Sequence, residues 1–176
     1  MYGIVRWGSY IPKYRIKVED VASAHGVNSN QIKTGLKITE KSVPGIDEDT
    51  VTIAVEAARN ALVKFDSKKI GAIYIGSESH PYAVKPTGTI VSSAIGMGNN
   101  YTTADFEFAC KAGTAAIQVS LGLIKSNMAK FVLAGAADTA QSKPGDTLEY
   151  TAAAGGAGFL LGQNPAAIIN HTISFT

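Results

Sequence analysis

Apolar positions follow two different spacings along the chain, and these predict strands and helices in alternation. Residues 2–11 are rich in apolar and aromatic side chains up to Pro12, which is typical of a strand. Continuous apolar runs at Ile70–Gly76 and Phe131–Gly135 are typical of strands that are covered on both faces. Further extended segments are predicted at residues 101–108, 155–161 and 166–175.

The clearest helix is predicted over residues 49–65, where apolar side chains recur at helical spacing. Acidic residues at 47–49 suit the positive end of that helix. Other helices are predicted at residues 17–25, 29–36, 87–95 and 113–126. Strands that alternate with helices favour parallel pairing with helices on the sheet faces, so we predict an α/β fold for residues 1–176.

Composition narrows the class of protein. Lys and Arg exceed Asp and Glu by only two, too few for a nucleic-acid binder that relies on phosphate contacts. No apolar run approaches the ~18 residues of a membrane span. The first residues lack the plan of a signal peptide, so we expect a cytoplasmic protein. One cysteine and three scattered histidines argue against a disulfide framework and against a metal site.

The charged fraction, 17%, lies below the roughly 25% of average soluble domains. Together with a length of 176 residues, this suggests that part of the surface meets another protein surface.

Cys110 lies where an extended segment meets a predicted helix. A thiol in the first turn of a helix is activated by the helix dipole, and Lys111 would add to this effect if it pointed the same way. Gly113 would let a substrate or another loop approach the backbone closely. From the residues alone, two interpretations stay open: a nucleophile, or a cysteine that packs in the core.

Glu78 follows the predicted strand that ends at Gly76, where ligands of open α/β sheets bind. Partial desolvation there would make it a general base, but it is equally a loop carboxylate or a helix cap. Two interpretations also stay open for His80, a hydrogen-bonding residue of the loop or a catalytic residue. His25 and His171 are predicted to be structural or exposed. The glycine-rich run at 155–158 leads into a strand, so it fails the context of a dinucleotide fingerprint and indicates tight backbone packing instead.

Several motifs together resemble archaeal-type hydroxymethylglutaryl-CoA synthases, a family of thiolase-like condensing enzymes. The resemblance extends over essentially the whole chain and is carried by residues 8–16, 40–44, 47–59 and 76–87 and by the Cys110 segment. It implies the N-terminal half of a five-layered αβαβα sandwich, with a mostly parallel sheet and covering helices. The second half, with the family's histidine and CoA-binding residues, lies outside this sequence.

The resemblance also implies a reaction and roles for four residues. Acetyl-CoA and acetoacetyl-CoA would condense to hydroxymethylglutaryl-CoA, in the mevalonate pathway that leads to isoprenoids. Cys110 matches the nucleophile that carries the acetyl group, and Glu78 matches the general acid/base. Asp138 lies near an acidic neighbour of the family's site, and Gly113 is expected to line the substrate site. No cofactor beyond the CoA thioesters is implied.

Partners are expected from the same resemblance. They are a second copy of the protein in a homodimer, an acetoacetyl-CoA thiolase and a small zinc-ribbon/OB-fold scaffold protein. Two other functions stay open: a ketoacyl-acyl carrier protein synthase III, which does not need a carboxylate at Glu78, and a non-catalytic half-fold subunit. We predict that these 176 residues alone have little or no activity.

Overall fold

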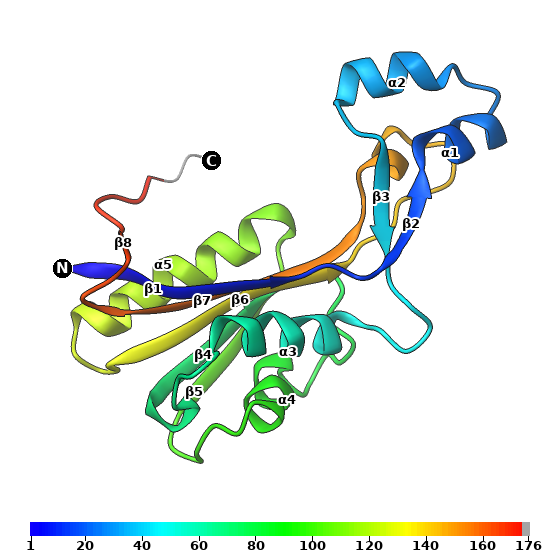
Figure 1. Cartoon of the computed structure of the whole chain (residues 1–176). Coiled ribbons are helices and arrows are strands. Elements are labelled where there is room, and N and C mark those ends of the chain that lie inside the picture. Colours follow the sequence, from blue (N-terminus) through cyan, green and yellow to red (C-terminus); the bar gives the residue numbers. More distant parts are fainter. Residues whose placement is uncertain (174–176) are drawn as a thin grey trace.

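A computed structural model describes residues 1–173 of the chain, and a mixed sheet runs through its centre (Figure 1). The strand order is β5-β4-β6-β7-β1-β8. The strands are β1 (Tyr2–Tyr10), β4 (Ile70–Gly76), β5 (Thr102–Phe106), β6 (Phe131–Thr139), β7 (Ala154–Gln163) and β8 (Ala167–Ile168).

Parallel pairing is confined to one side of this sheet. Strand β4 pairs in parallel with β5 and β6, whereas β7 runs antiparallel to both β6 and β1. Strand β1 therefore points the same way as β4, β5 and β6, and four of the six described strands share one direction. The predicted mostly parallel sheet is confirmed in this sense. The antiparallel pairing of β7 arises because β6 and β7 are joined by a loop that reverses the chain.

Helices cover both faces of the sheet. Helices α3 (Thr50–Ala61) and α4 (Thr87–Ala94) lie on one face, and α5 (Ala112–Lys125) lies on the other (Figure 1). Alternate residues of β4 separate the two cores: Ile73 and Ile75 join the cluster under α3, while Ala72 and Tyr74 join the cluster under α5. Burial on both faces explains why these strands read as continuous apolar runs.

A small lobe projects from one end of the sheet (Figure 1). It consists of the antiparallel pair β2 (Tyr14–Lys17) and β3 (Glu40–Val43) with helices α1 (Val18–Ala24) and α2 (Ser29–Leu36). Its own apolar cluster joins three residues of α1 to Tyr150. Both helices were predicted, but neither strand was: β2 is only four residues long, and the residues of β3, Glu-Lys-Ser-Val, carry no apolar pattern.

Some element bounds differ from the prediction. Helix α3 ends at Ala61 instead of residue 65, and the chain turns through Lys64, whose φ is 59°. Strand β6 continues to Thr139, four residues further than its apolar run. The predicted strand at 166–175 is wrong for most of its length, since only Ala167–Ile168 pairs; its last two residues lie outside the described range.

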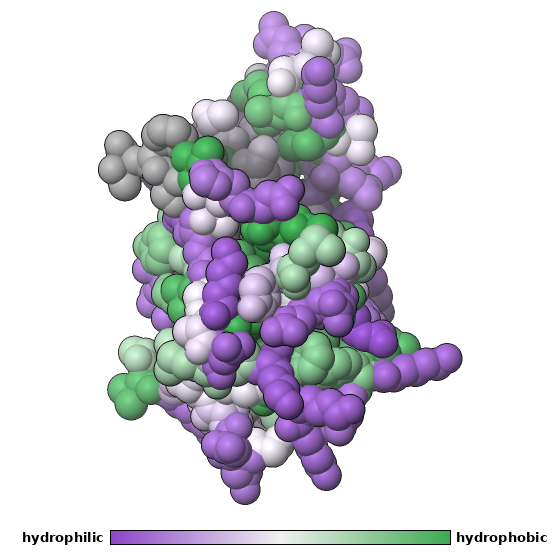
Figure 2. Space-filling view, turned by 90° about the vertical axis from the view of Figure 1, so that its left-hand side faces the viewer, coloured by the Kyte–Doolittle hydropathy of each residue, from purple (hydrophilic) through white to green (hydrophobic). Residues whose placement is uncertain are grey.

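The end of the molecule at which β1 begins shows apolar side chains interspersed with polar ones (Figure 2). Among the described residues, no helix combines the length and the apolar character that a membrane crossing requires.

Candidate functional site

The candidate site lies at the edge where the three parallel strands end. Strand β4 ends at Gly76, β5 ends at Phe106 and β6 ends at Thr139. Glu78 follows β4 by two residues, Cys110 follows β5 by four, and Asp138 is the penultimate residue of β6. Residues that are up to 60 positions apart in the chain therefore meet at one edge, where ligands of α/β sheets bind.

Cys110 sits in a 3₁₀ turn, Ala109–Lys111, that leads directly into α5. Ala109 has a φ of 55°, in the left-handed region that costs an alanine roughly 1–2 kcal/mol. The bend leaves Cys110 exposed at the start of α5 instead of buried in the core. Backbone strain of this kind is concentrated at functional sites, so the geometry favours the interpretation of Cys110 as a reactive thiol.

Two glycines let α5 begin close to the sheet. A Cβ on Gly76 would lie 2.4 Å from the carbonyl carbon of Ala112, and a Cβ on Gly113 would lie 2.7 Å from the Cβ of Ala136. The absence of these two side chains brings the start of α5 against the ends of β4 and β6. The predicted close approach at Gly113 is thus made by another element of the protein, and the residue also lines the cavity described next.

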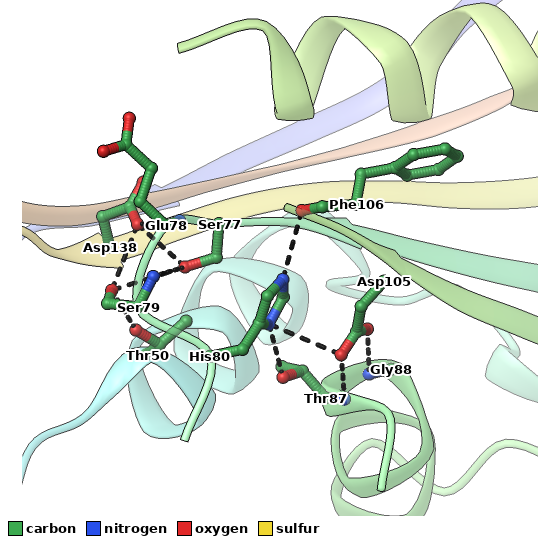
Figure 3. Close-up of polar contacts among 10 residues, drawn as sticks. All are labelled: Thr50, Ser77, Glu78, Ser79, His80, Thr87, Gly88, Asp105, Phe106 and Asp138. Atoms are coloured by element: carbon green, nitrogen blue, oxygen red, sulfur yellow. Dashed lines mark hydrogen bonds and ion pairs between the residues drawn. The ribbon is translucent and has the colours of Figure 1, made fainter. Parts of the chain in front are cut away.

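The Cys110 Sγ lies 4.0 Å from Oε1 of Glu78, near the limit of a sulfur hydrogen bond. Glu78 is exposed, and its carboxylate points away from the polar groups around its backbone (Figure 3). Beside the thiol is a cavity of about 340 Å³, whose lining includes Cys110, Gly113 and Asp138. The thiol therefore lines a cavity, and the exposed Glu78 carboxylate lies beside the thiol.

Asp138 holds the backbone that carries Glu78. Its Oδ1 accepts hydrogen bonds from the Glu78 N–H at 2.7 Å, the Ser77 hydroxyl at 2.8 Å and the Ser79 hydroxyl at 3.1 Å (Figure 3). Thr50 of α3 completes the group through the Ser79 hydroxyl, at 2.7 Å. Oδ1 of Asp138 is therefore occupied by donors of the protein, which points to a positioning part for this residue in the site.

Geometry also shows where Lys111 and His25 lie. The ammonium of Lys111 donates to the side-chain oxygen of Gln118 at 2.7 Å, so it is turned along α5 and not toward the thiol. His25 is structural, since it pairs with Glu149 at 2.9 Å. The Gly145 N–H and this histidine lower the pKa of the Glu149 carboxyl below its usual value. Among residues 1–173, no three His, Cys, Asp or Glu side chains gather as metal ligands.

The glycine-rich run in β7 serves packing, as predicted. A Cβ on Gly156 would lie 2.8 Å from Ile53 of α3, and one on Gly158 would lie 3.3 Å from the Ala57 carbonyl oxygen. Helix α3 thus lies directly on β7.

Comparison with known proteins shows what this chain is similar to. A hydroxymethylglutaryl-CoA synthase of Methanocella arvoryzae is 62% identical over 99% of this chain, and one of Archaeoglobus fulgidus is 57% identical over the whole chain. The chain is related to one half of a hydroxymethylglutaryl-CoA synthase. It spans about half the length of the curated relatives it matches, 51% and 52% of these two. No family model matches the chain.

Solved structures agree on the fold. A crystal structure of a hydroxymethylglutaryl-CoA synthase complexed with CoA superposes with a TM-score of 0.86 at 28% identity, over 93% of this chain and 42% of that one. A β-ketoacyl-acyl carrier protein synthase III from Thermus thermophilus shares the fold at 20% identity, with a TM-score of 0.82 over 92% of this chain and 51% of that one. The predicted thiolase-like half-fold is confirmed.

Several residues around the site were not singled out from the sequence. They are Thr50, Ser77, Ser79, Thr87 and Asp105. One signal was present: the two serines flank Glu78, as expected where short hydroxyl side chains hold a loop. The partners of these serines come from α3 and β6, and no local pattern indicates them.

Proposed function

We propose that this chain supplies the nucleophile and the general acid/base of a hydroxymethylglutaryl-CoA synthase. The enzyme would condense acetyl-CoA with acetoacetyl-CoA in the cytoplasm. The observation that carries the proposal is the distance of 4.0 Å between the Glu78 carboxylate and the Cys110 thiol, which itself lines a cavity. The similarity to synthases over the whole chain supports the same reaction.

The proposed reaction has three steps. Cys110 attacks the thioester carbonyl of acetyl-CoA, and CoA leaves with the thiol proton. Glu78 then removes a proton from the methyl group of the acetyl-cysteine, and the resulting carbon nucleophile attacks the ketone of acetoacetyl-CoA. Glu78 returns the proton to the new alkoxide. Water finally hydrolyses the bond to Cys110, which releases hydroxymethylglutaryl-CoA and restores the thiol.

The chain corresponds to about half of its relatives, so we propose that a second half completes the substrate site. That half would supply the histidine and the CoA-binding basic residues. Dimerisation and the complex with a thiolase and a scaffold protein belong to the same proposal. These 176 residues alone are then expected to show little or no turnover.

The test uses this chain together with the remaining half, whether on one polypeptide or two. Intact-mass measurement after incubation with acetyl-CoA should show an acetyl adduct that is lost in Cys110→Ala. Glu78→Gln should keep the adduct but slow condensation by about 10²-fold or more, the usual contribution of a general acid or base. Glu107→Gln, which removes another exposed carboxylate three residues before Cys110, is the matched control and should leave condensation near the wild-type rate.

Two outcomes would favour the other functions. Condensation that survives Glu78→Ala would contradict the synthase and favour an enzyme like ketoacyl-acyl carrier protein synthase III. A folded, completed protein that forms no adduct would favour a non-catalytic subunit.

A further inference from the structure

The His80 side chain is buried, and along the chain it lies between Glu78 and a run of residues that are exposed. It lies two residues after Glu78, and residues 81–85 that follow it are exposed. The His80 side chain is nevertheless only 4% exposed. Burial of an imidazole costs free energy unless its ring nitrogens form hydrogen bonds inside the protein.

Both ring nitrogens have partners on other elements (Figure 3). Nε2 lies 3.2 Å from the carbonyl oxygen of Phe106, the last residue of β5. A carbonyl oxygen only accepts hydrogen bonds, so Nε2 carries a proton and donates it. Nδ1 lies 2.7 Å from the Thr87 hydroxyl and 3.4 Å from the Asp105 carboxylate. In the neutral ring, Nδ1 accepts from Thr87.

These partners are themselves fixed. The Asp105 carboxylate accepts the N–H groups of Thr87 at 2.6 Å and of Gly88 at 3.2 Å, which ties β5 to the start of α4. The Phe106 carbonyl also accepts the Ser77 N–H at 3.0 Å. His80 thus anchors the loop after β4 to the strand whose continuation carries Cys110, four residues beyond Phe106.

Hydrogen bonds to the two strands that neighbour β4 hold the loop that carries Glu78, and none of these bonds involves the Glu78 carboxylate. Ser77 and Ser79 fasten its loop to Asp138 of β6 (Figure 3), and the Ser77 N–H and the His80 ring both fasten it to the Phe106 carbonyl of β5. Removing the β6 contacts would disturb Glu78 and the sheet together. The histidine instead joins the two segments that carry Glu78 and Cys110.

We infer that His80 is a positioning residue that sets the distance between the Glu78 carboxylate and the Cys110 thiol. The expected effect of His80 on condensation rests on the proposed function. Its expected effect on the distance between Glu78 and Cys110 does not. Proton removal from the acetyl group depends on this distance, whereas attack of the thiol on acetyl-CoA depends on it less. A displacement of ~1 Å in a reacting group costs up to about 10²-fold in rate.

Two variants of His80 separate its contacts in the complete two-half protein. Gln reaches as far as Nε2 and can still donate to the Phe106 carbonyl, whereas Asn ends near Nδ1 and cannot. We expect His80→Asn to slow condensation by about 10- to 100-fold while acetylation of Cys110 changes less than threefold. His80→Gln should recover most of the condensation rate. A parallel fall of both steps in both variants, matched by a loss of folded protein, would overturn the inference.

A second measurement does not depend on turnover. The rate of Cys110 alkylation by iodoacetamide is measured for the wild type, Glu78→Gln, His80→Asn and the double variant. In the protein that keeps His80, Glu78→Gln removes the negative charge beside the thiol. This change should speed alkylation, because the reactive form of Cys110 is the thiolate. The acceleration should shrink in the His80→Asn background. An equal effect in both backgrounds, or none in either, would overturn the inference even if the proposed synthase activity stands.

Discussion

The two helices that pack on opposite faces of the sheet begin in opposite ways. Helix α3 starts with a complete capping box, in which Asp49 and Thr52 satisfy each other's backbone N–H groups. Helix α5 has no side-chain cap, and its preceding residue Lys111 is already helical. It emerges from the 3₁₀ turn that carries Cys110, after the strained Ala109.

The difference shows that one helix start contributes mainly to the stability of the fold, whereas the other positions a residue of the candidate site. The capping box of α3 is local, since Asp49 and Thr52 lie three residues apart, although Thr50 in the same turn also contacts Ser79. The start of α5 is held by close contact with β4 and β6, and this leaves a thiol exposed at its first turn. Changes at the capping pair Asp49 and Thr52 should therefore affect mainly stability, whereas changes at the start of α5 should also move the site.

The largest effect is expected for Gly76→Ala. The added Cβ would meet the Ala112 backbone at 2.4 Å, and backbone cannot yield as a side chain can. We expect a loss of about 3 kcal/mol in the free energy of unfolding, measured by denaturant titration. Iodoacetamide should also modify Cys110 at a changed rate in the folded protein. Unchanged stability would show that α5 is not held by this contact.

A moderate effect is expected for Asp49→Ala at the start of α3. The variant loses the side-chain acceptor for the Thr52 N–H, at 2.8 Å, and should cost about 1 kcal/mol of stability. Asp49→Asn keeps an acceptor and is the matched control, with a loss of only a few tenths. The Cys110 alkylation rate should stay constant in both. A change in that rate would argue against the separation of the two helix starts.

Gly122→Ala provides an opposite, stabilising change within α5. Gly122 is exposed in the helix, and a Cβ there would have no atom within 4 Å. The substitution should raise the free energy of unfolding by about 0.5–1 kcal/mol, because alanine loses less backbone entropy than glycine in a helix. A thermal melt checks this. Destabilisation would mean that α5 packs differently in this region.

The smallest effect is expected for Ala109→Gly. Glycine relieves a left-handed cost of roughly 1–2 kcal/mol, but it adds about 0.5–1 kcal/mol of unfolded-chain entropy. The two contributions largely offset each other, so the net change in stability should be under about 1 kcal/mol. Ala109→Val is the contrasting variant, because β-branched side chains tolerate a positive φ poorly. Equal stability of the two variants would contradict the strained turn.

Local patterns were sufficient for most elements. The apolar run Ile70–Gly76 and the helix 29–36 match β4 and α2 at both ends. Periodicity failed where no apolar pattern exists, as in β3, and where a strand pairs only briefly, as in β8. It also could not give the antiparallel pairing of β7, because strand direction depends on which partner the chain meets after a loop.

The sequence by itself determined the residue types and their local settings: a lone cysteine at a helix start, a carboxylate after a buried strand, and a resemblance to synthases across the chain. Only the tertiary structure decided that Cys110 and Glu78 lie 4.0 Å apart, that Lys111 turns away and that His80 is buried against the end of β5 and the start of α4. The reason is physical. Propensity and capping act over a few residues, whereas this site is assembled at the ends of three strands that the chain brings together from distant positions.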